Sequence, residues 1–172
     1  TKSDDEGESW DSLTVLSLFD EDEENELDGT SYLLQQRVDV SANGNYVHVA
    51  WIDYDSYNGG YDIYYIKSNN NGNTWSEPSS IGTASSPGGT TIQSSGSDVV
   101  VAWVDFGDIY VVSSGTNGDS WGSEQLLEGL STNLNYMPEM IHSEGKFHIV
   151  WSNTAFGDSV QYTNSVDGDD WG

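Results

Sequence analysis

Residues 68–75 read Ser68-Asn-Asn-Asn-Gly-Asn-Thr-Trp75, and this phrase recurs along the chain with a glycine always three residues before a tryptophan. The other copies are Ser3-Asp-Asp-Glu-Gly-Glu-Ser-Trp10, Ser114-Gly-Thr-Asn-Gly-Asp-Ser-Trp121 and Asn164-Ser-Val-Asp-Gly-Asp-Asp-Trp171. Glycine supplies the positive φ of a tight turn, an Asp or Asn side chain bonds back to nearby amides, and tryptophan closes over the turn. Each phrase therefore predicts a turn.

The other three tryptophans end a second repeated phrase, which has the composition of a β-strand. This phrase reads Tyr46-Val-His-Val-Ala-Trp51, Val99-Val-Val-Ala-Trp103 and Phe147-His-Ile-Val-Trp151, so it recurs 52 and then 48 residues further on. No stretch of ten or more residues shows a capped helical period. A repeat of this length in such a composition predicts an all-β repeat fold.

The turn phrase resembles the Asp box, Ser-x-Asp-x-Gly-x-x-Trp, of the sialidase-like (BNR-repeat) β-propeller family, and the resemblance extends from residue 3 to residue 171. The first copy matches at every position, whereas the later copies have Asn70, Thr116 and Val166 at the Asp position and Asn164 at the Ser position. The residues assigned to the box are Ser3, Asp5, Gly7, Trp10, Ser68, Asn70, Gly72, Trp75, Ser114, Gly118, Trp121, Gly168 and Trp171. The resemblance implies β-propeller blades of four-stranded antiparallel sheets, with each box between the third and fourth strands, away from the catalytic face.

The repeats divide the chain into about three blades. Residues 1–19 are expected to hold a box and an orphan outer strand, Leu13–Phe19, and residues 20–32 an acidic loop. The blades are expected at 33–84, 85–130 and 131–172, with Ser85–Thr90 as a Gly-rich linker and the third blade without its fourth strand.

Three blades are fewer than the roughly four to eight that close a propeller. We therefore expect either further blades of the same polypeptide or completion by other copies of this chain. Leu13–Phe19 is a candidate strand to complete the last blade of a neighbouring molecule.

Twenty-nine acidic residues against four basic ones give a formal charge of −25. One explanation is a salt-adapted (halophilic) organism, because molar salt screens like charges to a reach of about 3 Å. Another is binding of Ca²⁺ by carboxylate-rich loops. The charge excludes nucleic acid and anionic membranes as partners, since the sequence has no basic patch that could bind their phosphate groups. No apolar run approaches the ~20 residues of a membrane span, and the absence of cysteine is compatible with an extracellular or cell-surface protein.

Sialidases hold the substrate carboxylate with three arginines and use a Tyr/Glu nucleophilic pair with an Asp acid/base. This chain has a single arginine, Arg37, whose expected role is a structural salt bridge, so no sialidase catalytic residue is carried over. We expect a non-catalytic module for binding or structural assembly, with a protein or glycan ligand. The alternative is part of a glycoside hydrolase whose catalytic residues lie mostly outside this segment.

Candidate ligand-binding residues lie in the loops after the Trp-bearing strands, where a propeller gathers them on one rim. They are Asp53, Asp55, Asp105, Asp108, Asp158, Tyr54, Phe106 and Phe156. The carboxylates suit turn formation, cation binding or a glycosidase pair, and Asp53 with Asp55 is the best local pair for a metal. The aromatic rings suit stacking on sugars, a protein contact or packing between blades. His48 and His148 share one repeat position and are expected to be strand residues rather than ligands.

Overall fold

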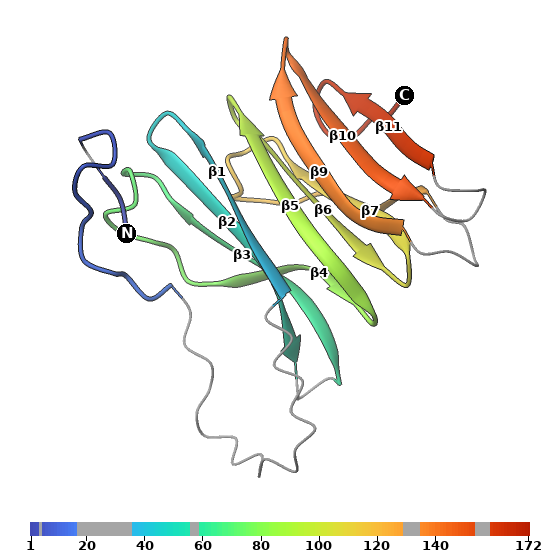
Figure 1. Ribbon diagram of the computed structural model, residues 1–172, viewed down its shortest axis with the longest axis horizontal. Coiled ribbons are helices and arrows are strands. Elements are labelled where there is room, and N and C mark those ends of the chain that lie inside the picture. Colours follow the sequence, from blue (N-terminus) through green and yellow to red (C-terminus); the bar gives the residue numbers. More distant parts are fainter. Residues whose placement is uncertain (4, 17–35, 56–58, 129–134, 154–158) are drawn as a thin grey trace.

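The computed structural model describes residues 1–3, 5–16, 36–55, 59–128, 135–153 and 159–172. These residues form three antiparallel sheets that stand side by side (Figure 1), and none of them lies in a helix. The all-β class, built of four-stranded antiparallel sheets, is confirmed. In the part of the chain that the structure describes, no helix is long and apolar enough to cross a membrane.

Each sheet is a meander in which consecutive strands pair. The first sheet contains β1 (Gln36–Asn43), β2 (Tyr46–Asp55), β3 (Gly60–Ser68) and β4 (Ser79–Ala84). The second sheet contains β5 (Pro87–Ser95), β6 (Asp98–Asp105), β7 (Asp108–Ser114) and β8 (Gln125–Glu128). The third sheet contains β9 (Asn135–Ser143), β10 (Lys146–Asn153) and β11 (Ser159–Ser165).

One expectation about these boundaries needs correction. The stretch Ser85–Thr90 is not a linker throughout, because β5 begins at Pro87 and pairs with β6 across a bulge between Pro87 and Gly89. Residues 13–16 of the expected strand Leu13–Phe19 pair with no strand among the described residues, and 17–19 lie outside them, so this strand of a preceding or partner blade stays a prediction. The acidic loop at 20–32 also lies outside them.

The second sheet lies between the other two, which explains the continuous apolar run of β6. Side chains alternate between the faces of a strand, so Val101 and Trp103 face the first sheet while Val100 and Ala102 face the third. Both faces are buried, and every residue from 99 to 104 is buried. The core therefore consists of two apolar layers, one on each side of β6.

The apolar layer between the first two sheets joins Ala50, Ile52, Ile63 and Tyr65 to Ile92, Val99, Val101, Trp103 and Val112. The layer between the second and third joins Val100, Ala102, Val104, Ile109 and Val111 to Met140, Phe147, Ile149 and Trp151. Hydrogen bonds also fix how the first two sheets are aligned: Asp39 Oδ2 accepts hydrogen bonds from the Thr91 hydroxyl and from the Ile92 N–H, both at 2.9 Å. The sheets are thus fixed to one another through their inner strands.

The repeated Gly-x-x-Trp phrases form turns that follow β3, β7 and β11, and a further turn lies at residues 3–10. In three turns the serine Oγ accepts the glycine N–H, at 2.7 Å for Ser3, 2.8 Å for Ser68 and 2.9 Å for Ser114. A second hydrogen bond joins the two ends of each of these turns. The side-chain oxygen of Asp5, Asn70 or Thr116, two residues after the serine, accepts the N–H of the residue just before the tryptophan, at 2.9 Å in all three turns. These bonds explain why the phrase repeats.

The fourth turn corrects the assignment of Asn164 and Val166 to the Ser and Asp positions. Ser165 Oγ accepts the Gly168 N–H at 2.9 Å, and Asp167 Oδ1 accepts the Asp169 N–H at 3.0 Å. Asn164 instead lies in β11, paired with His148. This turn is one residue shorter than the others, since it lacks the left-handed residue that precedes glycine in them.

Candidate functional site

The β2–β3 and β6–β7 hairpins lie along one edge of the sheets, the lower edge in Figure 1, opposite the Gly-x-x-Trp turns. We call this edge, residues 53–62 and 105–108 as far as they are described, the hairpin rim. It carries Asp53, Tyr54, Asp105, Phe106 and Asp108 of the candidate site. The side chain of Asp55, at the end of β2, and all of Phe156 and Asp158 lie outside the described residues.

Phe106 projects from the tightest part of the rim. Asp105 pairs with Asp108, so Phe106 and Gly107 form a two-residue turn with φ of 50° and 85°. Two positive φ values match the twist of a β-hairpin, but a bulky residue seldom adopts one. The Phe106 N–H donates to the Ser86 carbonyl at 3.1 Å, while 70% of the residue stays exposed. The fold therefore holds an aromatic ring outward in a conformation that is costly for its residue type.

Asp105 has a structural task beside this ring. Its Oδ1 accepts the N–H groups of Ser85 and Ser86, at 2.9 and 2.7 Å, and so fastens the connection between β4 and β5. Sequence gives no sign of this pairing, because the partners lie about 20 residues earlier in the chain. Asp108 is the first residue of β7, and it also interacts with other groups of the protein.

Asp53 and Tyr54 lie on β2 opposite Asp62 and Tyr61 of β3. The rings of Tyr54 and Tyr61 meet edge to face with centroids 5.2 Å apart, and Tyr54 remains 54% exposed. Asp53 is half-buried, and its Oδ1 accepts the Tyr54 N–H at 2.8 Å. Burial raises the pKa of Asp53 above its ordinary value, and the hydrogen bond from Tyr54 opposes the shift only in part. The rim thus presents aromatic surface next to a carboxyl group that favours its protonated form more than usual.

A metal site on the rim is not apparent in the residues described. Within these ranges, no three acidic or histidine side chains converge into a group that could hold an ion. The suggested pair of Asp53 and Asp55 is not tested by this, because the Asp55 side chain is outside the described residues.

A second feature, not anticipated from the sequence, is a histidine–tyrosine pair that occurs in two sheets. His48 Nδ1 lies 2.7 Å from the Tyr65 hydroxyl, and His148 Nδ1 lies 2.8 Å from the Tyr162 hydroxyl. Both ring pairs are stacked, with centroids 6.0 Å apart. The signal in the sequence was the equal placement of both histidines three residues before a strand tryptophan.

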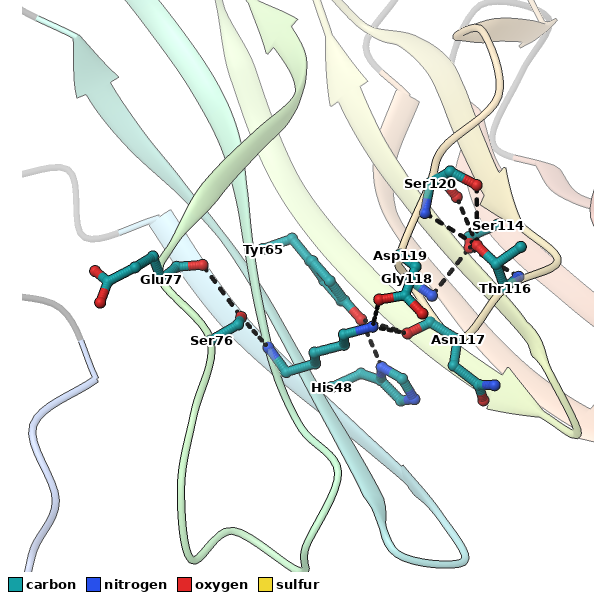
Figure 2. A network of polar contacts seen from close by, with 11 residues as sticks. His48, Tyr65, Ser76, Glu77, Ser114, Thr116, Asn117, Gly118, Asp119 and Ser120 are labelled. Atoms are coloured by element: carbon teal, nitrogen blue, oxygen red, sulfur yellow. Dashed lines mark hydrogen bonds and ion pairs between the residues drawn. The ribbon is translucent and has the colours of Figure 1, made fainter.

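The two pairs differ in exposure. Burial, reinforced by the positive charge of Lys67, lowers the pKa of His48 to about 4, and burial raises the pKa of Tyr65. Figure 2 shows this pair facing residues 117–119 of the next sheet's turn. Tyr162, by contrast, is 56% exposed. It borders a hollow of about 460 Å³ on the open face of the third sheet.

No protein-family model matches this chain, and no curated protein matches it. Solved structures do match. They include the α-L-arabinanase of Penicillium chrysogenum complexed with arabinobiose (TM-score 0.57, 13% identity, 80% of this chain and 48% of that one). The GH93 α-L-arabinofuranosidase of Fusarium graminearum complexed with arabinobiose also matches (TM-score 0.58, 14% identity, 80% and 47%). A third match is the xyloglucan PUL protein GH43B of Bacteroides ovatus (TM-score 0.53, 12% identity, 80% and 28%).

These structures are β-propeller glycoside hydrolases, so the likeness shows that the chain has a related propeller fold. At identities this low the likeness concerns the fold alone. The chain spans less than half the length of each of the three proteins.

Proposed function

We propose that this chain is a segment of an Asp-box type propeller that binds carbohydrate through the hairpin rim and does not hydrolyse it. The observation that carries the proposal is the outward Phe106 ring, held at positive φ and exposed. Strain of this kind is concentrated at ligand sites, where it preorganises a contact. The exposed Tyr54 gives the rim of the first sheet a second aromatic surface.

The chemistry of the rim suits a neutral or basic sugar. Aromatic faces bind the apolar faces of sugar rings, and carboxylates accept bonds from hydroxyl groups. A formal charge of −25 disfavours anionic glycans such as sialosides. The structural neighbours include two proteins complexed with arabinobiose, which makes neutral arabino-oligosaccharides the first probes to use. The proposal also includes a location outside the cell in a salt-adapted organism and the binding of Ca²⁺ by the acidic loops.

Titration with arabinobiose and with xyloglucan oligosaccharides, followed by calorimetry, tests the proposal. Phe106→Ala should weaken binding at least about fivefold, since truncation of a central aromatic contact costs more than about 1 kcal/mol. Trp10→Ala is the matched control, because Trp10 is also an exposed aromatic residue but lies on a Gly-x-x-Trp turn, away from the rim. Equal binding by both variants, or the absence of binding to any neutral glycan, would refute the proposal.

A glycoside hydrolase is the second candidate function, and one observation favours it. Burial raises the pKa of Asp53, and Asp62 lies directly opposite on β3, an arrangement that resembles an acid beside a second carboxylate. The test is release of reducing sugar from arabino-oligosaccharides by the chain and by Asp53→Asn. Activity that disappears in Asp53→Asn would replace the binding proposal with the enzymatic one.

A further inference from the structure

The hairpin rim carries an exposed aromatic residue at the same repeat position in two successive sheets. Tyr54 and Phe106 each stand three residues after the tryptophan that ends the strand phrase of their sheet. Both side chains are exposed, although each belongs to a strand or turn that is otherwise well packed. The repeat therefore places two aromatic rings on one edge of the molecule, one sheet apart.

Tyr54 lies on the face of the first sheet that meets the second sheet. Side chains two residues apart on a strand point to the same face, and Ile52 belongs to the apolar layer between these two sheets. Tyr61, whose ring meets that of Tyr54 edge to face, packs against the same layer. Tyr54 therefore points toward the sheet that carries Phe106.

A continuous stretch of backbone connects the two rings. Tyr61 pairs with Ala84 at the end of β4. The chain then passes through Ser85 and Ser86 into β5, and the Ser86 carbonyl accepts a hydrogen bond from the Phe106 N–H at 3.1 Å. We call this part of the rim the seam; it consists of Tyr54, Tyr61, Ser85, Ser86 and Phe106.

The seam is held in place and also offers polar groups. Asp105 Oδ1 accepts the N–H groups of Ser85 and Ser86, so the connection cannot shift without losing two hydrogen bonds. Both serines are exposed, and a serine hydroxyl can donate as well as accept a hydrogen bond. A ligand that contacts both rings therefore passes over hydroxyl groups on a connection that is already ordered, which lowers the entropic cost of binding.

Carboxylates border the seam on the side of the second sheet. Asp105 and Asp108 pair directly across β6 and β7. Tyr110, further along β7, packs against the apolar layer between the first two sheets. Burial, and then the charges of Asp108, Asp105 and Glu124, raise the pKa of its hydroxyl. A site with such a border repels acidic sugars and can accept hydrogen bonds from the hydroxyl groups of neutral ones.

We propose that the seam binds an unbranched neutral oligosaccharide longer than a disaccharide, with one sugar unit on Phe106 and another on Tyr54. Packed sheets lie roughly 10 Å apart, which exceeds the width of one sugar ring, so the two aromatic rings contact different units. The units between them lie over Ser85 and Ser86. This inference rests on the proposed binding of neutral glycans by the rim, and it adds the length and the path of the ligand.

Calorimetric titration of the 172-residue chain with arabinobiose and with arabinohexaose tests the inference. Arabinobiose binds at Phe106 alone, whereas arabinohexaose also reaches Tyr54. Arabinohexaose should therefore bind at least about fivefold more tightly, which corresponds to about 1 kcal/mol. Tyr54→Ala should abolish this gain and leave the dissociation constant of arabinobiose within about twofold.

Two further variants separate the effect of the ring from an effect on folding. Tyr54→Phe keeps the aromatic face and should keep the gain for arabinohexaose. Tyr162→Ala is the matched control, because Tyr162 is 56% exposed, close to the 54% of Tyr54, but lies on β11 of the third sheet, away from the seam. It should leave the binding of both sugars unchanged. A galacturonate oligomer of the same length as arabinohexaose should not bind to the wild-type chain.

The outcomes distinguish this inference from the proposed function. If no neutral glycan binds, both fail. If arabinobiose and arabinohexaose bind equally to the wild-type chain, or if Tyr54→Ala weakens both sugars equally, the seam is not the path of the ligand and a site at Phe106 alone remains. Binding of the galacturonate oligomer as tightly as arabinohexaose would overturn the neutral class of ligand.

Discussion

A methyl group added at Gly118 tests how closely the second sheet is fitted to the first. The Cβ of Gly118→Ala would overlap the Tyr65 hydroxyl oxygen and lie 2.5 Å from Tyr65 Cζ. Tyr65 cannot move aside easily, because it is buried and its hydroxyl lies 2.7 Å from His48 Nδ1. Its ring also packs edge-on against Trp121, with centroids 4.8 Å apart. The substitution therefore forces either the turn or the tyrosine out of place.

The expected loss has two parts. A φ of +76° costs an alanine about 1–2 kcal/mol, and overpacking of a buried contact costs about 1–3 kcal/mol. The free energy of unfolding should therefore fall by about 2–5 kcal/mol. Gly72→Ala is the control, because its φ of +79° imposes the same backbone cost while only Trp75 of its own turn lies within 4 Å. It should lose only about 1–2 kcal/mol.

The measurement is urea unfolding followed by tryptophan fluorescence, with linear extrapolation, at concentrations where each variant is monomeric. The difference between the two variants isolates the contact between sheets from the strain in the turn. If Gly118→Ala and Gly72→Ala differ by less than about 0.5 kcal/mol, the contact of Gly118 with Tyr65 is not tight and the reasoning fails.

Two further outcomes follow from single side chains. Burial lowers the pKa of His48 to about 4 in the folded chain, whereas in the unfolded chain it is about 6.5. Between these two pH values the unfolded chain binds a proton more readily than the folded chain does. The free energy of unfolding therefore falls as the pH falls through this window. Against His48→Asn, the wild-type chain should lose about 3 kcal/mol more between about pH 7 and pH 4 in urea unfolding, and parallel pH profiles would contradict this. Asp105→Ala should lower the free energy of unfolding by about 2–3 kcal/mol in thermal unfolding, because the Ser85 and Ser86 amides lose their acceptor. Asp105→Asn keeps an acceptor oxygen and should lower it by only about 1 kcal/mol. Equal losses in the two variants would assign the effect to the charge of Asp105 instead.

The strands and turns of this chain were predictable because their signals are local. Glycine and tryptophan stand at fixed offsets within a turn, and the apolar phrase ending in Trp103 marks a strand that is buried on both faces. The fourth turn was misassigned because it is one residue shorter. Counting back from Trp171 placed Asn164 in the position that Ser165 occupies. The pair Ser165-x-Asp167 was the signal that could have found it.

The contacts between sheets could not be predicted in the same way. Gly118 meets Tyr65 across more than 50 residues of sequence, and nothing near either residue identifies the other. The aromatic content of the rim was predictable, since Phe106 and Tyr54 follow strand tryptophans. The role of Asp105 in holding the β4–β5 connection could not be predicted, because it depends on where that connection passes.

The glycine contacts also bear on how such repeats can change over time. The turn of each following repeat packs against side chains of the sheet before it. Gly118 lies against Tyr65, which is bonded to His48, and Asp119 pairs with Lys67, whereas Gly168 lies against Val100. A substitution that enlarges one member must be compensated in the next repeat rather than in its own. Correlated substitutions should therefore appear about one repeat length apart, and exchanging a whole sheet between related propellers should succeed only when the following turn is exchanged with it.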